Sequence, residues 1–312
     1  MPNWNEVLAK INAVKAQILN ASALDIVRRE YVKSLADYTG RATIAYYSAW
    51  LTRSPNAANL SINDADKNAL MAVIHNLDRT KGLDLILHTP GGGLAATESL
   101  VDYLRRMFGT DIRAIVPQIA MSAGTMIACS CKEIVMGKES NLGPIDPQMN
   151  GVPAHGVIAE FEEAIKQVSA NPASLPVWQA IIGKYHPTYL GECQNALVWS
   201  EEIVEEWLVS GMFKVKGVSK ASARVKAKKI VAKLSDHKAT RSHSRHIHID
   251  DCIKMGLKIV KLEDDKKLQD LVLTAHHAYM QTFADATTVS KIVENQLGVA
   301  MILHGPVPPN TR

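Results

Sequence analysis

Hydrophobic and polar positions in the middle of the chain follow two alternating patterns. Short apolar runs typical of strands occupy 83–90, 112–120 and 133–138. Segments with apolar residues at helical spacing, 97–109 and 122–131, lie between these runs. Strand and helix alternation of this kind predicts a mostly parallel sheet with helices packed on its faces.

The residues before this alternation predict two charged helices, a strand and a third helix. The second helix, 24–40, ends at Gly40, the β-branched and aromatic segment 42–51 is a strand, and the helix within 61–82 ends at Gly82. The first helix lacks the uninterrupted apolar stretch of a signal peptide. No run of about 18 apolar residues occurs, so we expect no membrane span.

From Gly156 onward the pattern becomes mainly helical, and no repeat is visible. The helical segments are 157–170, 175–186, 200–211 and 268–284. We therefore expect four regions. They are an N-terminal helical segment (1–40), an α/β core (41–210), a C-terminal basic helix with an α/β extension packed on that core (211–303) and a flexible tail (304–312).

Composition predicts a globular, cytoplasmic protein. The hydrophobic fraction is 47%, and the four cysteines, which are unevenly spaced, are expected to be reduced. The formal net charge of +4 is too small for binding of nucleic acid by charge alone, and none is expected.

One segment departs from this balance, because 214–233 holds eight lysines or arginines and no acidic residue. Its spacing predicts a basic amphipathic helix that could contact acidic lipid, nucleic acid or a negatively charged partner. The simpler interpretation, a solvated helix over the mouth of the site, is favoured.

The sequence "HTPGGG", 88–93, follows the strand at 83–90 directly. In an open parallel sheet ligands bind beyond the carboxyl ends of the strands, where glycines let backbone N–H groups approach a substrate. Gly91 and Gly92 could donate to a developing oxyanion. Alone, such a turn could equally hold a phosphate or be a simple tight turn.

Ser122 lies in "QIAMSAGTMIA", where the next strand gives way to a helix. The N–H of Ala123 at the helix start would be a second oxyanion donor beside Gly92. A serine here could instead be an ordinary N-cap. That alternative leaves the glycine turn at the neighbouring strand end unexplained.

Three motifs together, "TPGGG", "AMSAGT" and "SNLGPIDPQ", resemble the ClpP-like serine peptidases. The specific resemblance is to the serine dehydrogenase proteinase family, which is related to signal peptide peptidase A, and it extends over most of the chain. It implies an α/β fold of the ClpP/crotonase-like spiral of ββα units with helical N- and C-terminal additions. It also implies a serine hydrolase acting on peptides or proteins, a homo-oligomer and no cofactor.

The resemblance implies Ser122 as nucleophile, with Gly91, Gly92 and Ala123 around the oxyanion. A serine hydroxyl needs a neighbouring base, which is histidine or lysine in related families. The interval after the serine offers Lys138, His155 and Lys166, of which His155 is the first choice and Lys166 the second. Asp146 is expected to brace its loop rather than to orient a base.

Two other groups of histidines could have a functional or structural role. One is "HSRHIHIDDC", whose candidate metal ligands are His243, His246, His248, Asp250, Asp251 and Cys252. Their spacing fits no structural metal motif, so surface or inter-subunit contacts are preferred and no metal is expected. The other is His276 with His277, one of which is expected in the interior.

Two alternatives to a serine peptidase remain. A crotonase-type acyl-CoA enzyme would use the same paired N–H groups to hold a thioester enolate, with a carboxylate as base. A scaffold of the same fold without a competent base is the non-enzymatic alternative.

Overall fold

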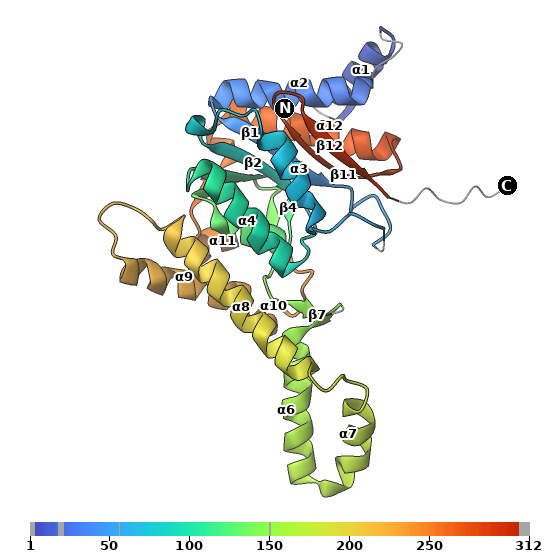
Figure 1. Cartoon of the computed structure of the whole chain (residues 1–312), viewed down its shortest axis with the longest axis vertical. Coiled ribbons are helices and arrows are strands. Elements are labelled where there is room, and N and C mark those ends of the chain that lie inside the picture. The colour runs from blue at the N-terminus through green and yellow to red at the C-terminus, as the bar shows by residue number, and fades with distance from the viewer. Residues whose placement is uncertain (1–3, 18–21, 56, 150, 306–312) are drawn as a thin grey trace, which may run out of the picture.

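The computed structural model describes residues 4–17, 22–55, 57–149 and 151–305, and its centre is a seven-stranded mixed sheet (Figure 1). Five neighbouring strands are parallel, and the last two pair antiparallel. In spatial order the strands are β10 (Ile259–Lys261), β5 (Glu133–Met136), β3 (Ile112–Val116), β2 (Leu83–His88), β1 (Ala42–Ser48), β11 (Val289–Asn295) and β12 (Ala300–His304). The predicted α/β class is therefore confirmed.

Helices cover both faces of this sheet, because its central strands β1, β2 and β3 are buried almost throughout. One face packs against α2 (Ala23–Thr39) and α12 (Lys266–Asp285), with α1 (Trp4–Lys15) outside them. The opposite face packs against α3 (Ala65–Ile74), α4 (Leu94–Phe108) and α5 (Ala123–Ser130). Gly40 ends α2 in the left-handed conformation, as the sequence predicted.

A second sheet of three short strands lies beside the carboxyl ends of the main one. Its strands are β4 (Ile119–Ala120), β6 (Asn141–Leu142) and β9 (Ile247–His248). The pair β7 (Gln148–Met149) and β8 (Val152–Pro153) follows β6 along the chain. This small sheet brings a late segment of the chain, β9, next to the loop that carries Asp146.

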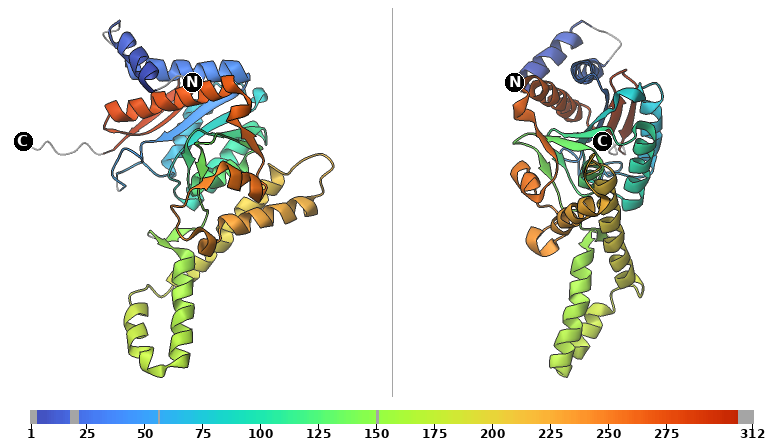
Figure 2. Two further views of the ribbon diagram at one scale, coloured as in Figure 1. Left: turned by 180° about the vertical axis from the view of Figure 1, so that it is seen from behind. Right: turned by 90° about the vertical axis from the view of Figure 1, so that its left-hand side faces the viewer.

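A helical arm extends away from the sheets (Figures 1 and 2). It is formed by α6 (Ala154–Ala170), η2 (Pro172–Ser174) and α7 (Leu175–Ile182), and α8 (Tyr189–Ser210) leads from it back to the body. The remaining elements are η1 (Arg79–Lys81), α9 (Lys220–Leu234), α10 (His237–Thr240), α11 (Ile249–Met255) and η3 (Leu262–Asp264). Among the described helices, none has the length and apolar character that crossing a bilayer requires.

Two local predictions are wrong, and two strands were not predicted. The helix predicted to continue to Gly82 ends at Ile74, because a loop and the short η1 intervene. The strand predicted over 112–120 is two strands, β3 and β4, which join different sheets. The strands β11 and β12 were not predicted, although β11 is fully buried and pairs with β1. Of the predicted flexible tail, 306–312 lies outside the described residues.

The strand β11 carries a buried ion pair that explains why its pattern does not alternate. Lys291 is fully buried, and its Nζ lies 2.7 Å from one Asp66 oxygen and 2.8 Å from the other. The same ammonium donates to the carbonyl of Ser61 at 2.9 Å. Charged residues of this kind conceal a strand from any reading based on hydrophobicity.

Candidate active site

The glycine turn and the serine motif are held together by the backbone. Beyond β2, the N–H of Thr89 donates to the carbonyl of Ile119 at 3.3 Å, and the N–H of Met121 donates to the carbonyl of Thr89 at 3.0 Å. This short parallel bridge ties the end of β2 to β4. The two sequence motifs are therefore neighbours in space, as predicted.

Gly91 touches Ser122 directly. Its φ is +99°, and a Cβ built on it would lie 2.7 Å from the Cβ of Ser122 and 2.8 Å from the carbonyl oxygen of Met121. A side chain would therefore both strain the backbone and collide with the serine residue. Glycine at this position lets the turn reach the hydroxyl-bearing residue.

Gly92 is constrained by the other side of the turn. The N–H of Ile62 donates to the carbonyl of Gly91 at 2.7 Å, and the N–H of Gly93 donates to the carbonyl of Ile62 at 3.0 Å. A Cβ on Gly92 would lie 2.2 Å from that Ile62 oxygen, so no larger residue fits without moving the turn.

Ser122 adopts a backbone conformation that L residues rarely occupy, with φ at 52° and ψ at −116°. Such conformations cost about 1–3 kcal/mol and occur often at functional sites. The residue precedes α5, yet its side chain makes no capping hydrogen bond. The ordinary N-cap alternative is therefore not what the structure shows.

Among the described residues, the backbone N–H groups of Gly92 and Ala123, near Ser122, have no hydrogen-bond partner. Ala123 opens α5, where the helix dipole favours negative charge. The N–H of Gly91, by contrast, donates to the hydroxyl of Thr89 at 3.1 Å. Of the three residues predicted to surround an oxyanion, Gly92 and Ala123 are therefore free to donate.

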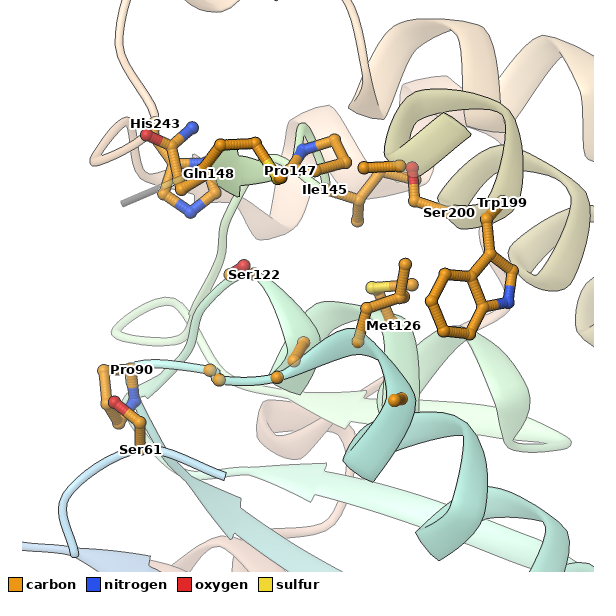
Figure 3. A pocket seen from close by; sticks show the side chains of 18 of the residues that line it. Ser61, Pro90, Ser122, Met126, Ile145, Pro147, Gln148, Trp199, Ser200 and His243 are labelled. Carbon is orange, nitrogen blue, oxygen red and sulfur yellow. The ribbon is translucent and has the colours of Figure 1, made fainter. Parts of the chain in front are cut away.

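A pocket of about 630 Å³ opens beside Ser122 (Figure 3). Its walls come from the glycine turn and α4, from α5, from the loop at 145–149 and from α8. The lining is mainly apolar and includes Leu94, Met126, Ile145, Met149, Ala196 and Trp199. An apolar chamber next to a partly exposed hydroxyl is typical of a substrate site.

His243 also lines this pocket, and Figure 3 shows its ring on the side of the Ser122 hydroxyl. The Nδ1 of His243 lies 2.8 Å from Oδ1 of Asp146, whose side chain is fully buried. Donation from Nδ1 to the carboxylate leaves Nε2 as the acceptor of a proton. Ser122 and His243 thus line one pocket, and the buried Asp146 contacts His243.

Asp146 has further partners that hold its carboxylate in place. The side-chain amide of Gln148 donates to Oδ2 at 3.1 Å, and Nδ1 of His237 lies 3.4 Å from the same oxygen. Asp146 therefore has a contact within its own loop, which fits the predicted bracing role, but it also contacts His243, whereas no histidine partner was expected from the sequence.

The histidine and lysine predicted as bases lie elsewhere. His155 begins α6, stacks on His237 with ring centroids 6.4 Å apart, and is not among the described residues that line the pocket. Lys166 is farther along α6, with 79% of its side chain exposed, and its nearest ion-pair partner is Glu163 at 3.8 Å. The structure does not bring either side chain to the pocket.

The pairing of His243 with Asp146 was not predicted, because the histidine-rich segment was treated as one cluster. The structure separates its members, since His246 and His248 are exposed, Cys252 is buried and only His243 turns toward Asp146. No group of three or more potential ligands in the described part of the chain converges on a metal position. The available signal was an aspartate in a proline-flanked loop, Asp146, to which no partner had been assigned.

His88, the last residue of β2, lies directly before the turn. It is fully buried against Tyr47 and His276, and this burial lowers the pKa of His88 to about 4. The imidazole is therefore neutral at physiological pH. His276, the neighbouring interior histidine that was expected, also has its pKa lowered by burial.

Comparison with known proteins gives a family match for the middle of the chain. Residues 54–173 match the family described as ClpP-like SDH-type serine proteinase, which confirms the resemblance that the three motifs indicated. This segment includes the glycine turn, Ser122 and Asp146, and it ends before His243.

Two uncharacterized proteins of Methanocaldococcus jannaschii are similar over part of their length. One is 35% identical over 108 residues, which are 35% of this chain and 36% of the relative. The other is 33% identical over 104 residues, or 33% of this chain and 35% of the relative. The chain thus spans about a third of the length of these relatives.

Proposed function

We propose that this chain is a serine peptidase in which Ser122 is the nucleophile, His243 the general base and Asp146 the residue that orients the base. The observation that carries the proposal is that Ser122, in a strained backbone conformation, shares a pocket with a histidine whose Nδ1 lies 2.8 Å from a buried carboxylate. The matching family supports a peptidase as the class of enzyme.

In the acylation step, Nε2 of His243 takes the proton of the Ser122 hydroxyl while Oγ attacks the carbonyl carbon of the substrate. Negative charge develops on the carbonyl oxygen, and the N–H groups of Gly92 and Ala123 stabilise it. The imidazolium then returns the proton to the leaving amine. Water hydrolyses the acyl-enzyme by the same proton path in reverse.

Asp146 stabilises the imidazolium that forms during both steps, and it fixes the tautomer in which Nε2 is free. Gln148 keeps the carboxylate oriented through its 3.1 Å bond. Gly91 has a steric role in this scheme, because its N–H is already bonded to Thr89 and its missing side chain makes room for Ser122. We assign no proton transfer to His155 or Lys166.

The lining of the pocket supports a peptide substrate with an apolar side chain next to the scissile bond. Met126, Ile145 and Trp199 form much of the wall beside Ser122 (Figure 3), and burial of an apolar side chain there would be favourable. We also propose that the main sheet and the β4–β6–β9 sheet belong to a ClpP/crotonase-like spiral, and that the protein acts as a homo-oligomer.

A fluorophosphonate probe tests the nucleophile directly, because it labels only activated serines. The wild-type protein should be labelled covalently, Ser122→Ala should not, and Ser61→Ala, which changes another serine of the same pocket, should be labelled like wild type. Absence of labelling in the wild-type protein at neutral and alkaline pH would contradict a serine hydrolase. It would favour the acyl-CoA or scaffold alternative.

A further inference from the structure

The positive charge of this protein is concentrated on one segment. Residues 214–233 hold eight lysines or arginines and no acidic residue, whereas the whole chain has a net charge of +4. The remainder of the chain therefore has a net charge of −4. Such a separation of charge orients a protein in the field of a charged partner.

This segment forms the loop after α8 and most of α9. In the views of Figures 1 and 2 the loop projects outward from the body, and α9 packs along α8. One face of α9 is buried in the core, through Ala223, Ala227, Ile230, Val231 and Leu234. The opposite face is open to solvent.

Among the described residues, Arg224 is the one cation of 214–233 that forms an ion pair. Arg224 pairs with Glu205 at 2.8 Å and with Glu206 at 3.2 Å. The seven lysines are all exposed, and none has an ion-pair partner in the described parts of the chain: Lys214, Lys216, Lys220, Lys226, Lys228, Lys229 and Lys233. This surface, which we call the lysine face, is a strong and unpartnered cationic patch.

Apolar side chains are also exposed on the lysine face. Val225 is 56% exposed, and Val215 and Val218 in the preceding loop are exposed as well. At about 100° per residue, Val225 lies opposite the buried stripe of α9 and between Lys228 and Lys229. Removing these exposed valine side chains from water would be energetically favourable.

We propose that the lysine face binds the surface of an anionic lipid bilayer. Lysine stems with exposed valines between them fit an interface where ammonium groups meet lipid phosphates and apolar groups enter the headgroup region. Nucleic acid fits less well, because every unpaired cation is lysine rather than the bidentate arginine and 214–233 contains no aromatic residue for base stacking. The proposal does not depend on the chemistry of Ser122.

Vesicle co-sedimentation of the full chain tests this binding. The protein should pellet with vesicles of phosphatidylcholine and phosphatidylglycerol, stay in solution with vesicles of phosphatidylcholine alone, and be released by added salt. The triple variant Lys226→Gln, Lys228→Gln, Lys229→Gln should lower the partition coefficient by about 10- to 100-fold. Val225→Ser should lower it by a few fold.

The matched control removes the same charge elsewhere, with Lys261→Gln, Lys266→Gln and Lys267→Gln, all at exposed positions. These substitutions should leave most of the binding intact. Equal binding to both kinds of vesicle, no binding to either, or equal losses in the two triple variants would overturn the proposal. Tight binding to duplex DNA that is unchanged by Val225→Ser, without vesicle binding, would overturn it in favour of a nucleic-acid surface.

Discussion

The two sides of the candidate active site are built in different ways. The nucleophile side is fixed by the backbone, since the bonds of Thr89 to β4 and the contact of Gly91 with Ser122 leave little freedom. The base side is fixed by side chains, through the bond of His243 to Asp146, and the His243 side chain is 24% exposed. Backbone geometry is encoded in short contiguous motifs, whereas a side-chain pair can join segments far apart in the sequence.

The largest expected effect is on the base side and concerns Asp146. Asp146→Asn removes the carboxylate that sets the tautomer of His243, so kcat/KM for an apolar peptide substrate should fall by about 10⁴-fold. Gln148→Ala, which only loosens the same carboxylate, should lower it by about 5-fold. Similar losses in the two variants would mean that Asp146 does no more than hold its loop.

A comparable effect, on the free energy of unfolding rather than on activity, is expected at the buried ion pair of Lys291 and Asp66. Lys291→Met leaves the carboxylate of Asp66 buried without its cation, so the free energy of unfolding should fall by about 3–5 kcal/mol. Denaturant titration measures this change. Lys81→Met, at an exposed surface pair, should change it by less than about 1 kcal/mol; equal changes would show that the burial of Lys291 is unimportant.

The next effect tests the oxyanion donor on the nucleophile side. Gly92→Ala places a Cβ against the backbone of Ile62, so the turn must move and its N–H should no longer point at the substrate. The rate of fluorophosphonate labelling should fall by about 10²- to 10³-fold. Gly93→Ala is the matched control, since its Cβ would have no neighbour closer than 3.8 Å; labelling of Gly92→Ala at the rate of Gly93→Ala would rule out the donor role.

The smallest expected effect is a pH dependence of the free energy of unfolding, which arises from the burial of His88. An unfolded imidazole binds a proton near pH 6.5, whereas burial keeps His88 neutral in the folded protein down to about pH 4. The stability due to His88 is therefore fully present above pH 6.5 and decreases as the pH falls from 6.5 to 4. Between pH 6.5 and 5 the wild type should lose about 2 kcal/mol of unfolding free energy relative to His88→Leu.

Parallel unfolding curves of the wild type and His88→Leu over that range would contradict the burial of His88. His276, whose pKa is lowered by burial and by the neighbouring His88, remains in both proteins, so the comparison measures His88 together with its coupling to His276. Tyr47 and Trp50, the aromatic neighbours of His88, are likewise unchanged.

The difference between local backbone motifs and long-range side-chain pairs also explains what the sequence could and could not predict. The parallel strands β2, β3 and β5 and the turn at 89–93 follow from apolar periodicity and from the properties of glycine, and all were found. The hairpin of β11 and β12 was missed because Lys291 and Glu294 are buried charges whose partners lie far along the chain.

His243 was missed for the same physical reason. No periodicity or spacing connects it with Asp146, and the connection arises only because β9 pairs with β6 and returns the chain to the pocket. His155 was preferred because the family resemblance implies a base on or near the helix that follows the serine motif, and His155 lies at the start of that helix. A histidine needs a buried carboxylate partner as well as a nearby position.

The central claim, that Ser122 and His243 act as one unit, is tested most directly by measuring the rate of fluorophosphonate labelling in His243→Ala and His155→Ala side by side, with circular dichroism as the check on folding. We predict a loss of about 10⁴-fold or more for His243→Ala and a rate within about 3-fold of wild type for His155→Ala. Retained labelling of folded His243→Ala, with loss in His155→Ala, would contradict the assignment.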